Sequence, residues 1–481
     1  MDNTDNKYGA LPLCVDLDGT LIATDTLLES TLAAIKLKTL ILFLIPLWVL
    51  RGKLYFKNRI ARIALPNPKT LPYRQDVLEF LISEKAAGRK LILATATVKE
   101  IAESVAGHLG IFDIVLATGD DCNLRDKQKM QALTELCGGK GFIYAGDSKA
   151  DLDVWAGSAA SVLVNPNSRI AKKARQLAPV YKEFNYKASF IKSFIKQIRV
   201  YQWIKNILVF LPIVLAHDFR NADLYLKLLT AFFSFSFVAS FVYIINDLLD
   251  LEADRLHPRK KNRPLASGKM HIKEALVTAP ALLLLSIAIS IIYLPLDFLI
   301  TLLVYFILTN AYSLYIKRLY LLDIMLLSGL YTIRIVAGAA AVSVFISPWL
   351  LALSIFIFFS LATMKRYTEL KVMQEQNRTK TKGRGYYVDD LALLLGFGPS
   401  SGLIAVLIFI LYVNSAEVIK LYDKPQMLLP IAGILMFWVL RLWFMAHRGK
   451  MTDDPIVYTA KDPVSYIVAL IISILAIGAS L

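Results

Sequence analysis

Two carboxylates one residue apart follow a short apolar run near the start of this 481-residue chain. The segment LPLCVDLDGT at 11–20 has the length of a buried strand, and it ends in Asp16 and Asp18. Open α/β sheets bind their ligands at the carboxyl ends of strands, so we expect both aspartates at such an edge. One carboxylate there can act as a nucleophile and the other can transfer a proton.

Two further candidate strands end in residues that suit the same chemistry. KLILATAT ends near Thr95, and GFIYAGDSKAD places Asp147 after a strand and Asp151 one helical turn later. Between them, NLRDKQKMQAL offers Lys129, with Lys127 as a competing choice. Phosphoryl transfer needs a nucleophile, a divalent cation, a proton donor and groups that hold the phosphoryl oxygens. The set therefore predicts phosphoryl-transfer chemistry.

Each of these residues has a predicted role. Asp16 would attack phosphorus, and Asp18 would protonate the leaving oxygen and then activate water. Thr95 and Lys129 would hold the transferring phosphoryl group. Carboxylate oxygens suit Mg²⁺, and the metal candidates are Asp16, Asp18, Asp147 and Asp151.

The ordered set DxDGT, Thr, Lys and GDSxxD resembles the haloacid dehalogenase phosphatase superfamily over roughly residues 10–165. The resemblance implies a Rossmann-like α/β domain at 1–165, with a parallel sheet and a small cap at about 24–88. Strands that alternate with helix-like stretches agree with this fold. The alternative is a domain that keeps these residues but has lost its activity.

An apolar run, Leu40 to Leu50, interrupts this domain. It is too short to span a bilayer, and it contains Pro46. It either touches the membrane surface or forms an ordinary buried helix of the cap. Basic residues on both sides favour the membrane surface.

Long apolar blocks dominate the chain after about residue 200. About nine have spanning or near-spanning length, at roughly 204–216, 224–246, 275–292, 296–311, 321–341, 347–364, 392–413, 427–446 and 464–481. They predict an all-α polytopic membrane bundle at 204–481.

Lys and Arg favour the loops on the side of the N-terminal domain by about six to one. That domain and the sites are therefore expected on the cytoplasmic side of the inner (cytoplasmic) membrane, and the polar N-terminus, which lacks a signal peptide's apolar stretch, agrees.

The formal net charge of +16 does not indicate a nucleic-acid partner, because the basic residues lie mainly in a linker and between the apolar blocks. The linker at 166–203 interleaves basic residues with Phe184, Phe190, Phe194 and Trp203. This composition is typical of a basic amphipathic helix on an anionic lipid surface.

A second acidic motif ends the second apolar block, in YIINDLLDLEADRLHPRKKNRPLASG at 243–268. Spacings of three and four predict Asp247, Asp250 and Asp254 on one helical face, with Asn246 beside them, and these four residues are the metal candidates of the segment. Carboxylates at the end of a membrane helix are costly, and Mg²⁺ bridging to a diphosphate would offset their repulsion. The candidates for holding phosphate oxygens are Arg255, Lys260 and Arg263.

This motif, NDxxDxxxDRxHPxKxxRP, resembles the UbiA superfamily of intramembrane prenyltransferases over roughly 195–481. The resemblance implies a second motif at the next inside loop, where Tyr312, Lys317 and Asp323 lie. Arg334 lies within the following span, and we expect it to face the cavity because a lone charge there is expensive.

The chain lacks the Pro-Gln and Leu-Gly elements of the UbiA enzymes that prenylate aromatic acids. QWIKN, MKRYTEL and DDPIVY instead resemble the branch that makes polyprenyl-phosphate ribose. That resemblance implies transfer of 5-phosphoribosyl from phosphoribosyl pyrophosphate to a polyprenyl phosphate, with Mg²⁺ and with Asp250 and Asp254 as catalytic residues. The candidates for positioning the two anions are Lys205, Lys317, Lys365 and Arg366.

The two motif sets predict one bifunctional enzyme. The phosphatase-like domain would remove the 5-phosphate and give polyprenyl-phospho-ribose, a step toward an arabinofuranose donor. The alternative is an aromatic (4-hydroxybenzoate-type) polyprenyltransferase with an accessory phosphatase. A transporter is disfavoured, because the motifs cluster on one face of the membrane and the two halves show no inverted repeat.

Overall fold

The computed structural model describes residues 8–9, 11–119, 124–186, 189–215, 221–379, 384–416, 418, 422–451 and 454–480. The chain forms two compact units. The first combines Met1–Ile198 with Tyr243–Thr278, and the second combines Arg199–Val242 with Ala279–Leu481.

Six strands form one parallel sheet in the first unit. In sheet order they are β3 (Ile114–Thr118), β2 (Leu91–Val98), β1 (Leu13–Val15), β4 (Ile143–Gly146), β5 (Ala160–Val164) and β6 (Val180–Phe184). The central strand β1 pairs Cys14 with Ile92 on one side and with Tyr144 on the other. Parallel sheets are covered on both faces, which agrees with the burial of every residue of β1 and β5. The predicted α/β fold is confirmed.

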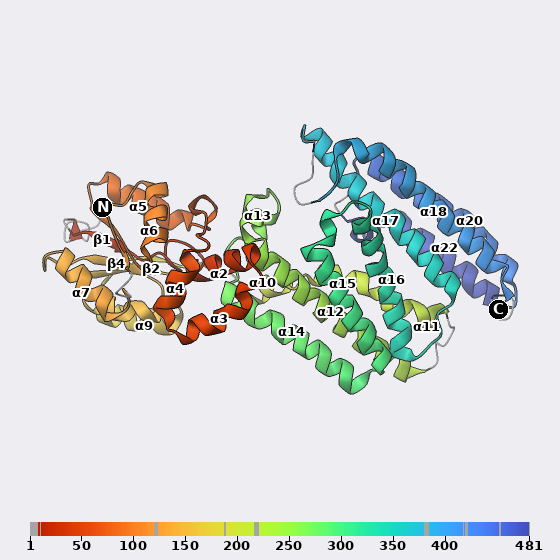
Figure 1. Cartoon of the computed structure of the whole chain (residues 1–481), viewed down its shortest axis with the longest axis horizontal. Coiled ribbons are helices and arrows are strands. Elements are labelled where there is room, and N and C mark those ends of the chain that lie inside the picture. The colour runs from red at the N-terminus through yellow and green to blue at the C-terminus, as the bar shows by residue number, and fades with distance from the viewer. Residues whose placement is uncertain are drawn as a thin grey trace. The chain divides into compact units, whose positions relative to one another are not determined.

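Helices cover both faces of this sheet. Leu13 and Val15 pack on one face with α5 (Gln75–Ala86) and α6 (Lys99–Leu109). Cys14 points the other way, because successive side chains of a strand alternate. It packs with α7 (Lys127–Leu136), α8 (Leu152–Ala156) and α9 (Ser168–Leu177). Figure 1 shows α5 and α6 on one side of the sheet and α7 and α9 on the other. Because β1 pairs in parallel with both β2 and β4, the carboxyl ends of these three strands meet at one edge of the sheet.

Three helices between β1 and α5 form the cap: α2 (Thr26–Leu37), α3 (Ile41–Leu50) and α4 (Lys53–Ala61). They pack on one another through a small core that contains Ala34, Ile41, Trp48, Ile60 and Ala64. The cap is shorter than the expected 24–88. The reason is that α5 has an apolar face, with Phe80 and Leu81, which the sheet buries.

The segment expected as a linker at 166–203 is largely folded. Helix α9 covers the sheet and β6 pairs with β5, so the sheet extends to Phe184 rather than ending at 165. The sequence VYKEF exposes Lys182 and forms an edge strand, a place where charged side chains are common. Helix α10 (Phe190–Gln197), with exposed Phe190 and Ile191, has the expected amphipathic character.

Eight helical segments of the described residues are long and apolar enough to cross a membrane. They are α12 (Ala222–Leu249), α14 (Ile272–Tyr293), α15 (Leu296–Leu314), α16 (Leu322–Val342), α17 (Pro348–Glu375), the segment 388–413 with α18 (Leu391–Val413), the segment 425–447 with α20 (Leu429–His447), and α22 (Pro463–Ser480). The first expected block, 204–216, forms the shorter η3 (Val200–Phe210) and α11 (Leu211–Leu215). The predicted polytopic helical bundle is confirmed.

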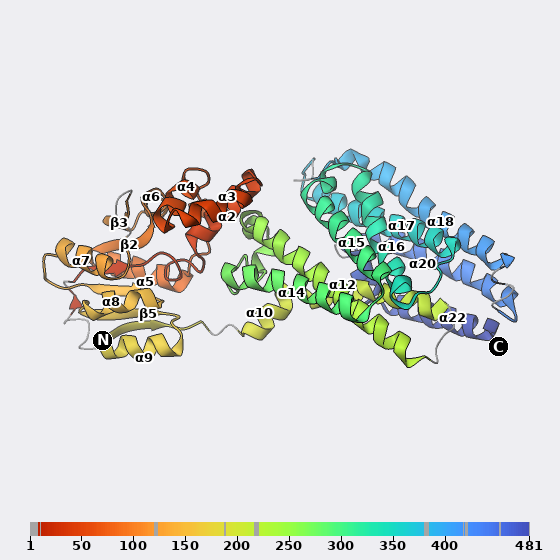
Figure 2. The same ribbon diagram turned by 60° about the horizontal axis from the view of Figure 1, so that its bottom comes forward.

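In the second unit each of the helices α15, α16, α17, α18 and α20 packs against the next one in this series. Figure 2 shows these helices together in one bundle. Glycines allow two close approaches. A Cβ on Gly338 of α16 would overlap the backbone of Val209 in η3, and one on Gly398 of α18 would overlap the Trp443 ring of α20. Small residues are common where membrane helices approach closely.

Candidate active sites

The end of β1 and the start of α7 bring a carboxylate and an amine together. Asp16 follows β1 directly, and Lys129 lies almost fully buried in the first turn of α7. Lys129 Nζ lies 3.2 Å from Asp16 Oδ1. Lys127, the competing candidate, is exposed. The structure therefore places Lys129, rather than Lys127, beside Asp16.

Asp147 and Asp151, which follow β4, form a carboxylate cluster with Asp16. One oxygen from each of the three lies within 4.8 Å of the others. Asp151 Oδ2 accepts hydrogen bonds from the backbone N–H groups of Asp147 (3.1 Å) and Ser148 (2.9 Å) and from the Ser148 hydroxyl (3.0 Å). These bonds fix Asp151 and the backbone of Asp147, so Asp16 and Asp147 have the more open oxygens for a cation.

Tyr144 of β4 joins the lysine to this cluster. Its fully buried hydroxyl accepts a hydrogen bond from Lys129 Nζ (2.9 Å) and donates one to Asp151 Oδ1 (2.8 Å). Buried polar networks of this kind hold their members in one geometry when every member is bonded. Tyr144 thereby orients both the lysine and the aspartate, a role that the sequence analysis did not identify.

Gly19 is required by the approach of Asp147. Its φ of +79° lies in the left-handed region, and a Cβ at this position would overlap the Asp147 carboxylate. Only glycine satisfies both conditions at low cost. This explains why the two strand-end aspartates are followed by glycine.

Asp18 is held away from the carboxylate cluster by hydroxyl groups. Thr26 donates to it from its N–H (2.7 Å) and its hydroxyl (3.1 Å), and the Thr97 hydroxyl donates at 2.7 Å. Thr97 also places its N–H 3.1 Å from the Thr95 hydroxyl, so Thr95 and Asp18 belong to one network. The Asp18 side chain is not in the cluster of possible metal ligands, contrary to its inclusion among the metal candidates.

The negative charges of the aspartates at this edge of the sheet are not balanced by nearby positive charges. Burial raises the pKa of Asp16 to about 6, although the positive charge of Lys129 opposes this shift. Burial and, to a smaller extent, the negative charge of Asp25 raise the pKa of Asp18 to about 7. Burial, together with Asp151 and Asp16, raises the pKa of Asp147 to about 8. One lysine does not neutralise three converging carboxylates. A divalent cation with oxygen ligands, such as Mg²⁺, fits the donor set of Asp16 and Asp147.

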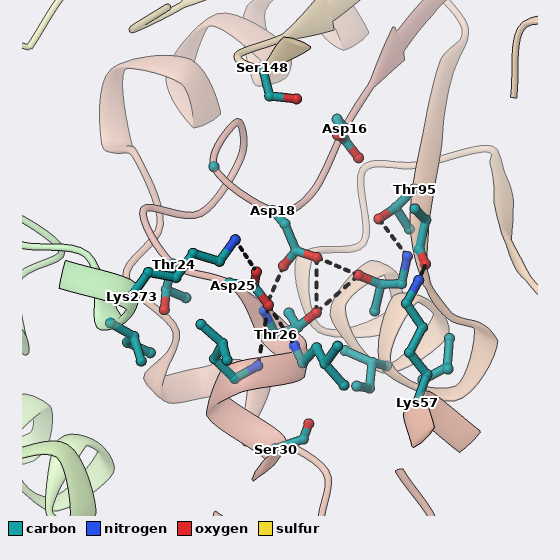
Figure 3. A pocket seen from close by; sticks show the side chains of 18 of the residues that line it. Asp16, Asp18, Thr24, Asp25, Thr26, Ser30, Lys57, Thr95, Ser148 and Lys273 are labelled. Carbon is teal, nitrogen blue, oxygen red and sulfur yellow. Dashed lines mark hydrogen bonds and ion pairs between the residues drawn. The ribbon is translucent and has the colours of Figure 1, made fainter. Parts of the chain in front are cut away.

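A cavity of about 460 Å³ opens in front of these groups. Figure 3 shows Asp16, Asp18 and Thr95 on its wall and Lys57 of α4 reaching in from the cap. Lys57 Nζ donates to the carbonyl of Ala96 (2.6 Å), and burial lowers its pKa to about 8. The cavity is large enough for a phosphorylated small-molecule group.

The three aspartates of the acidic membrane motif do not share one helical face as expected. The helix breaks at Asp250, between α12 and α13 (Leu251–Leu256). Asp247 and Asp254 therefore converge on Arg263, with Nη1 at 2.9 and 2.5 Å, whereas Asp250 pairs with Lys36 (3.0 Å). Asn246 lies one residue before Asp247, near the end of α12.

The cations expected to hold phosphate are partly engaged by protein. Arg255 donates from both terminal nitrogens to Glu29 (3.0 and 2.6 Å) and from Nε to the carbonyl of Ala266. Its donors are thus used in an ion pair, contrary to the expectation. Lys260 lies 3.9 Å from Asp254 and is half exposed.

A cation fits between Asp247 and Asp254, because one guanidinium nitrogen already bonds to both carboxylates. The amide nitrogen of Gln197 donates to Asp247 at 2.9 Å. Gln197 Oε1 is buried and has no hydrogen-bond partner in the described part of the chain. An acceptor left open beside two carboxylates suits a hard cation such as Mg²⁺.

The expected second motif assembles around Arg366 in the second unit. The fully buried guanidinium donates to Asp323 (2.7 Å), the Tyr312 hydroxyl (2.7 Å) and Glu369 (2.9 Å). Tyr386 donates to the other oxygen of Asp323 at 3.0 Å. Three predicted residues therefore come together. Arg366 orients Asp323 and Tyr312, and its nitrogens are not free for phosphate, contrary to the expectation.

Two predicted lysines meet at Asp454 before α21 (Pro455–Thr459). Lys205 of η3 forms an ion pair with Asp454, and Lys365 lies 3.6 Å from the same carboxylate oxygen. Burial alone would raise the pKa of Asp454, but Lys365 and Lys205 outweigh it and lower the pKa. Lys317 lies partly buried in η5 (Ile316–Arg318).

Arg334 lies inside the bundle, enclosed by protein groups. Its guanidinium donates to Asn206 (2.8 Å) and to the Tyr305 hydroxyl (3.2 Å), and it faces the rings of Phe235 and Tyr331. These partners offset the cost of the buried charge.

Comparison with known families agrees with both halves of the chain. Residues 207–460 match the UbiA prenyltransferase family, and residues 13–155 match the haloacid dehalogenase-like hydrolases. The UbiA match covers more than half of the 481 residues.

Three relatives differ in how much of the chain they match. The uncharacterized protein y4nM of Sinorhizobium fredii is 34% identical over 466 residues, 96% of this chain and 90% of that protein. Nodulation protein NoeC of Azorhizobium caulinodans is 32% identical over 292 residues, 60% of this chain and 93% of that protein. A decaprenyl-phosphate phosphoribosyltransferase of Mycolicibacterium smegmatis is 35% identical over 190 residues, 39% of this chain and 59% of the enzyme. Together with the membrane-length helices, these matches show that the chain is a multi-pass membrane enzyme of the UbiA prenyltransferase family, with a haloacid dehalogenase-like hydrolase domain at its N-terminus.

Proposed function

We propose that the UbiA part transfers 5-phosphoribosyl from phosphoribosyl pyrophosphate to a polyprenyl phosphate, and that the hydrolase domain then removes the 5-phosphate. One observation carries the proposal: a carboxylate–lysine phosphatase site lies on the same chain as a UbiA part similar to decaprenyl-phosphate phosphoribosyltransferases. Such a transferase makes a product that still bears a phosphomonoester, and a phosphatase is the activity that consumes it.

In the transferase step, the bond between ribosyl C1 and pyrophosphate breaks and a phosphate oxygen of the lipid bonds to C1. Asp247 and Asp254, which converge on one point, would hold Mg²⁺, and this ion when bound would supply positive charge toward the departing pyrophosphate; Asp250 pairs with Lys36 instead. Arg263 and Lys260 lie beside these carboxylates and would hold phosphate oxygens. In the second unit, Lys205, Lys317 and Lys365 are the candidate cations for the lipid phosphate.

An apolar cavity suits the lipid chain. It has a volume of about 610 Å³ and lies between α16, α17 and α18. Its serines are bonded to backbone carbonyls: Ser328 to Ile355 (2.7 Å) and Ser401 to Phe356 (2.8 Å). The wall is therefore apolar in effect, and an isoprenoid chain binds such a wall without losing hydrogen bonds.

In the phosphatase step, Asp16 attacks the 5-phosphoryl group and forms an aspartyl-phosphate. Asp18 protonates the departing ribose oxygen and then removes a proton from the water that hydrolyses the intermediate. Lys129 and Thr95 would hold the phosphoryl oxygens. Tyr144 keeps Lys129 in place through their 2.9 Å hydrogen bond.

Both sites are proposed to lie on the cytoplasmic side of the inner membrane, with a phosphatase domain at the N-terminus and the transferase domain after it. Joining two consecutive activities in one chain raises the effective concentration of the intermediate at the second site. The alternative, an aromatic prenyltransferase, would need a polyprenyl diphosphate donor and gives no reason for the fused phosphatase.

Pyrophosphate release distinguishes the two donors. Purified protein in detergent with Mg²⁺ receives either phosphoribosyl pyrophosphate with polyprenyl phosphate, or polyprenyl diphosphate with 4-hydroxybenzoate. We expect release only from the first pair, and a loss of about a hundredfold or more in Asp254→Asn. Asp223→Asn, exposed at the opposite end of α12, is the matched control and should retain activity. Release only from the second pair would reverse the assignment.

A further inference from the structure

Helix α3 of the cap leaves most of its apolar surface uncovered. Its sequence, ILFLIPLWVL, contains no polar side chain. Phe43 is 74% exposed, Leu47 57% and Leu50 83%. We call the exposed apolar residues the apolar ridge: Leu40, Leu42, Phe43, Leu44, Leu47, Val49 and Leu50. Soluble surfaces rarely keep so many large apolar side chains adjacent to one another, so this ridge indicates an interaction site.

One stripe of the helix is enough to hold it on the cap. Ile41, Ile45 and Trp48 recur at helical spacing and pack against α2 and α4. The ridge lies outside this contact. The interpretation of residues 40–50 as an ordinary buried helix is therefore excluded, since that helix would bury more than one stripe.

The charges around α3 identify the occupant as a lipid bilayer. Between Lys36 and Arg62 the chain has several basic residues and no Asp or Glu. Lys38 is exposed before the helix, and Arg51 and Lys53 are exposed after it; Lys36 pairs with Asp250. An apolar helix with basic ends is the pattern of a segment that lies in the interface of an anionic membrane. The described part of the same chain has eight helices of membrane-spanning length, so the protein resides in a bilayer to which α3 can bind.

The helices on either side of α3 line the catalytic cavity. Thr26, the first residue of α2, bonds to Asp18, and Lys57 of α4 points into the cavity (Figure 3). Lys53, the first residue of α4, also lies on the cavity wall. Anything that fixes α3 therefore fixes the wall of the phosphatase cavity.

We propose that α3 inserts its apolar ridge into the membrane interface and holds the phosphatase cavity at the headgroup level, where its substrate is a phosphomonoester on a lipid-linked sugar. The substrate class rests on the function proposed above, whereas the insertion does not. A helix of ten residues is about 15 Å long, so it lies in the interface and does not span the bilayer.

The position of α3 is measured on the full chain in phosphatidylcholine–phosphatidylglycerol vesicles. An environment-sensitive fluorophore is attached at Phe43→Cys, and acyl-chain-brominated lipid serves as the quencher. Cys122 and Cys137 are replaced by serine, and Cys14 is fully buried. Leu177→Cys, 44% exposed on α9 of the same unit, is the control. We expect quenching at 43 and none at 177. Equal, water-like emission at both positions would overturn the insertion.

The function of the ridge is measured with a matched substrate pair: ribose 5-phosphate in solution and polyprenyl-phosphoryl-ribose 5-phosphate in vesicles. The variant is Phe43→Ser with Leu47→Ser and Leu50→Ser, and Ile82→Ser, 49% exposed on α5, is the control. We expect the triple variant to lose about tenfold or more on the vesicle substrate, with hydrolysis of the soluble substrate retained.

The outcomes separate the two proposals. An unchanged vesicle rate, or an equal loss on both substrates, would overturn the role of the ridge. If wild type hydrolyses ribose 5-phosphate but not the lipid-linked compound, the proposed substrate is wrong. Quenching at position 43 would then still support insertion.

Discussion

Replacing Lys129 by methionine tests whether the carboxylate–lysine cluster is a working phosphatase site. Lys129 is 4% exposed, and its Nζ lies 3.2 Å from Asp16 and 2.9 Å from the Tyr144 hydroxyl. Methionine has nearly the same length and no charge. The substitution therefore removes the cation and leaves the packing largely intact.

The distance between Lys129 and Asp16 gives the strength of the interaction that the Lys129→Met substitution removes. At 3.2 Å and an effective dielectric constant of about 20, the attraction between the Lys129 and Asp16 charges is about 5 kcal/mol. Burial of the pair offsets part of it. A charged group that holds the transferring phosphoryl oxygens contributes about 3–4 kcal/mol to the transition state, so we expect kcat/KM to fall by about a hundredfold to a thousandfold.

The assay is hydrolysis of para-nitrophenyl phosphate by the full chain in detergent with Mg²⁺. Lys127→Met is the matched control, because Lys127 is exposed two residues earlier on the same helix, and it should retain wild-type activity. Thermal unfolding shows whether each variant is folded. A folded Lys129→Met protein with more than about a tenth of wild-type kcat/KM would refute the assignment.

Three further variants test other parts of the account. Burial lowers the pKa of Lys57 to about 8, so this lysine loses its charge as the pH rises through 8; KM for an anionic substrate should rise there, and Lys57→Gln should remove that dependence in a pH series of initial rates. Gly19→Ala should abolish phosphatase activity while pyrophosphate release by the transferase persists, whereas Gly107→Ala, with open space around it, should leave both assays unchanged. Arg366→Met leaves the buried Asp323 carboxylate and the Tyr312 hydroxyl without their guanidinium partner and should destabilise the folded protein by about 3–5 kcal/mol, seen as a lower Tm in detergent.

The sheet and its site were largely predictable because strand ends carry the chemistry. Asp16 and Asp147 each follow an apolar run, and parallel strands bring their carboxyl ends to one edge regardless of the intervening chain. The choice between Lys127 and Lys129 was open, since two residues on a helix point in different directions and only the packed helix shows which one is buried.

Residues that act through tertiary contacts were missed. Tyr144 lies within a strand whose pattern reads as core, and nothing in its neighbours in sequence shows that its hydroxyl meets Lys129 and Asp151. Thr97 bonds to Asp18 across 79 positions. The five residues of β6, VYKEF, are too few to carry a strong periodic signal, so the sequence favours a linker at this position.

The partners of the basic residues in the membrane part could not be predicted from the sequence. Arg255 and Arg366 were expected to bind phosphate, yet each bonds to a carboxylate of the protein. Sequence spacing gives the types of residue near an acidic motif but not their pairing. A break in a helix, as at Asp250, changes which carboxylates share a face.

The most direct test of the two consecutive reactions is the identity of the lipid product. Detergent-purified wild type and Asp16→Asn are incubated with Mg²⁺, polyprenyl phosphate and radiolabelled phosphoribosyl pyrophosphate, and the lipids are separated and analysed by mass spectrometry. We predict lipid-linked ribose from wild type and accumulation of the 5-phosphorylated lipid in the variant. The same dephosphorylated product from both proteins, or no lipid-linked sugar from either, would contradict the account.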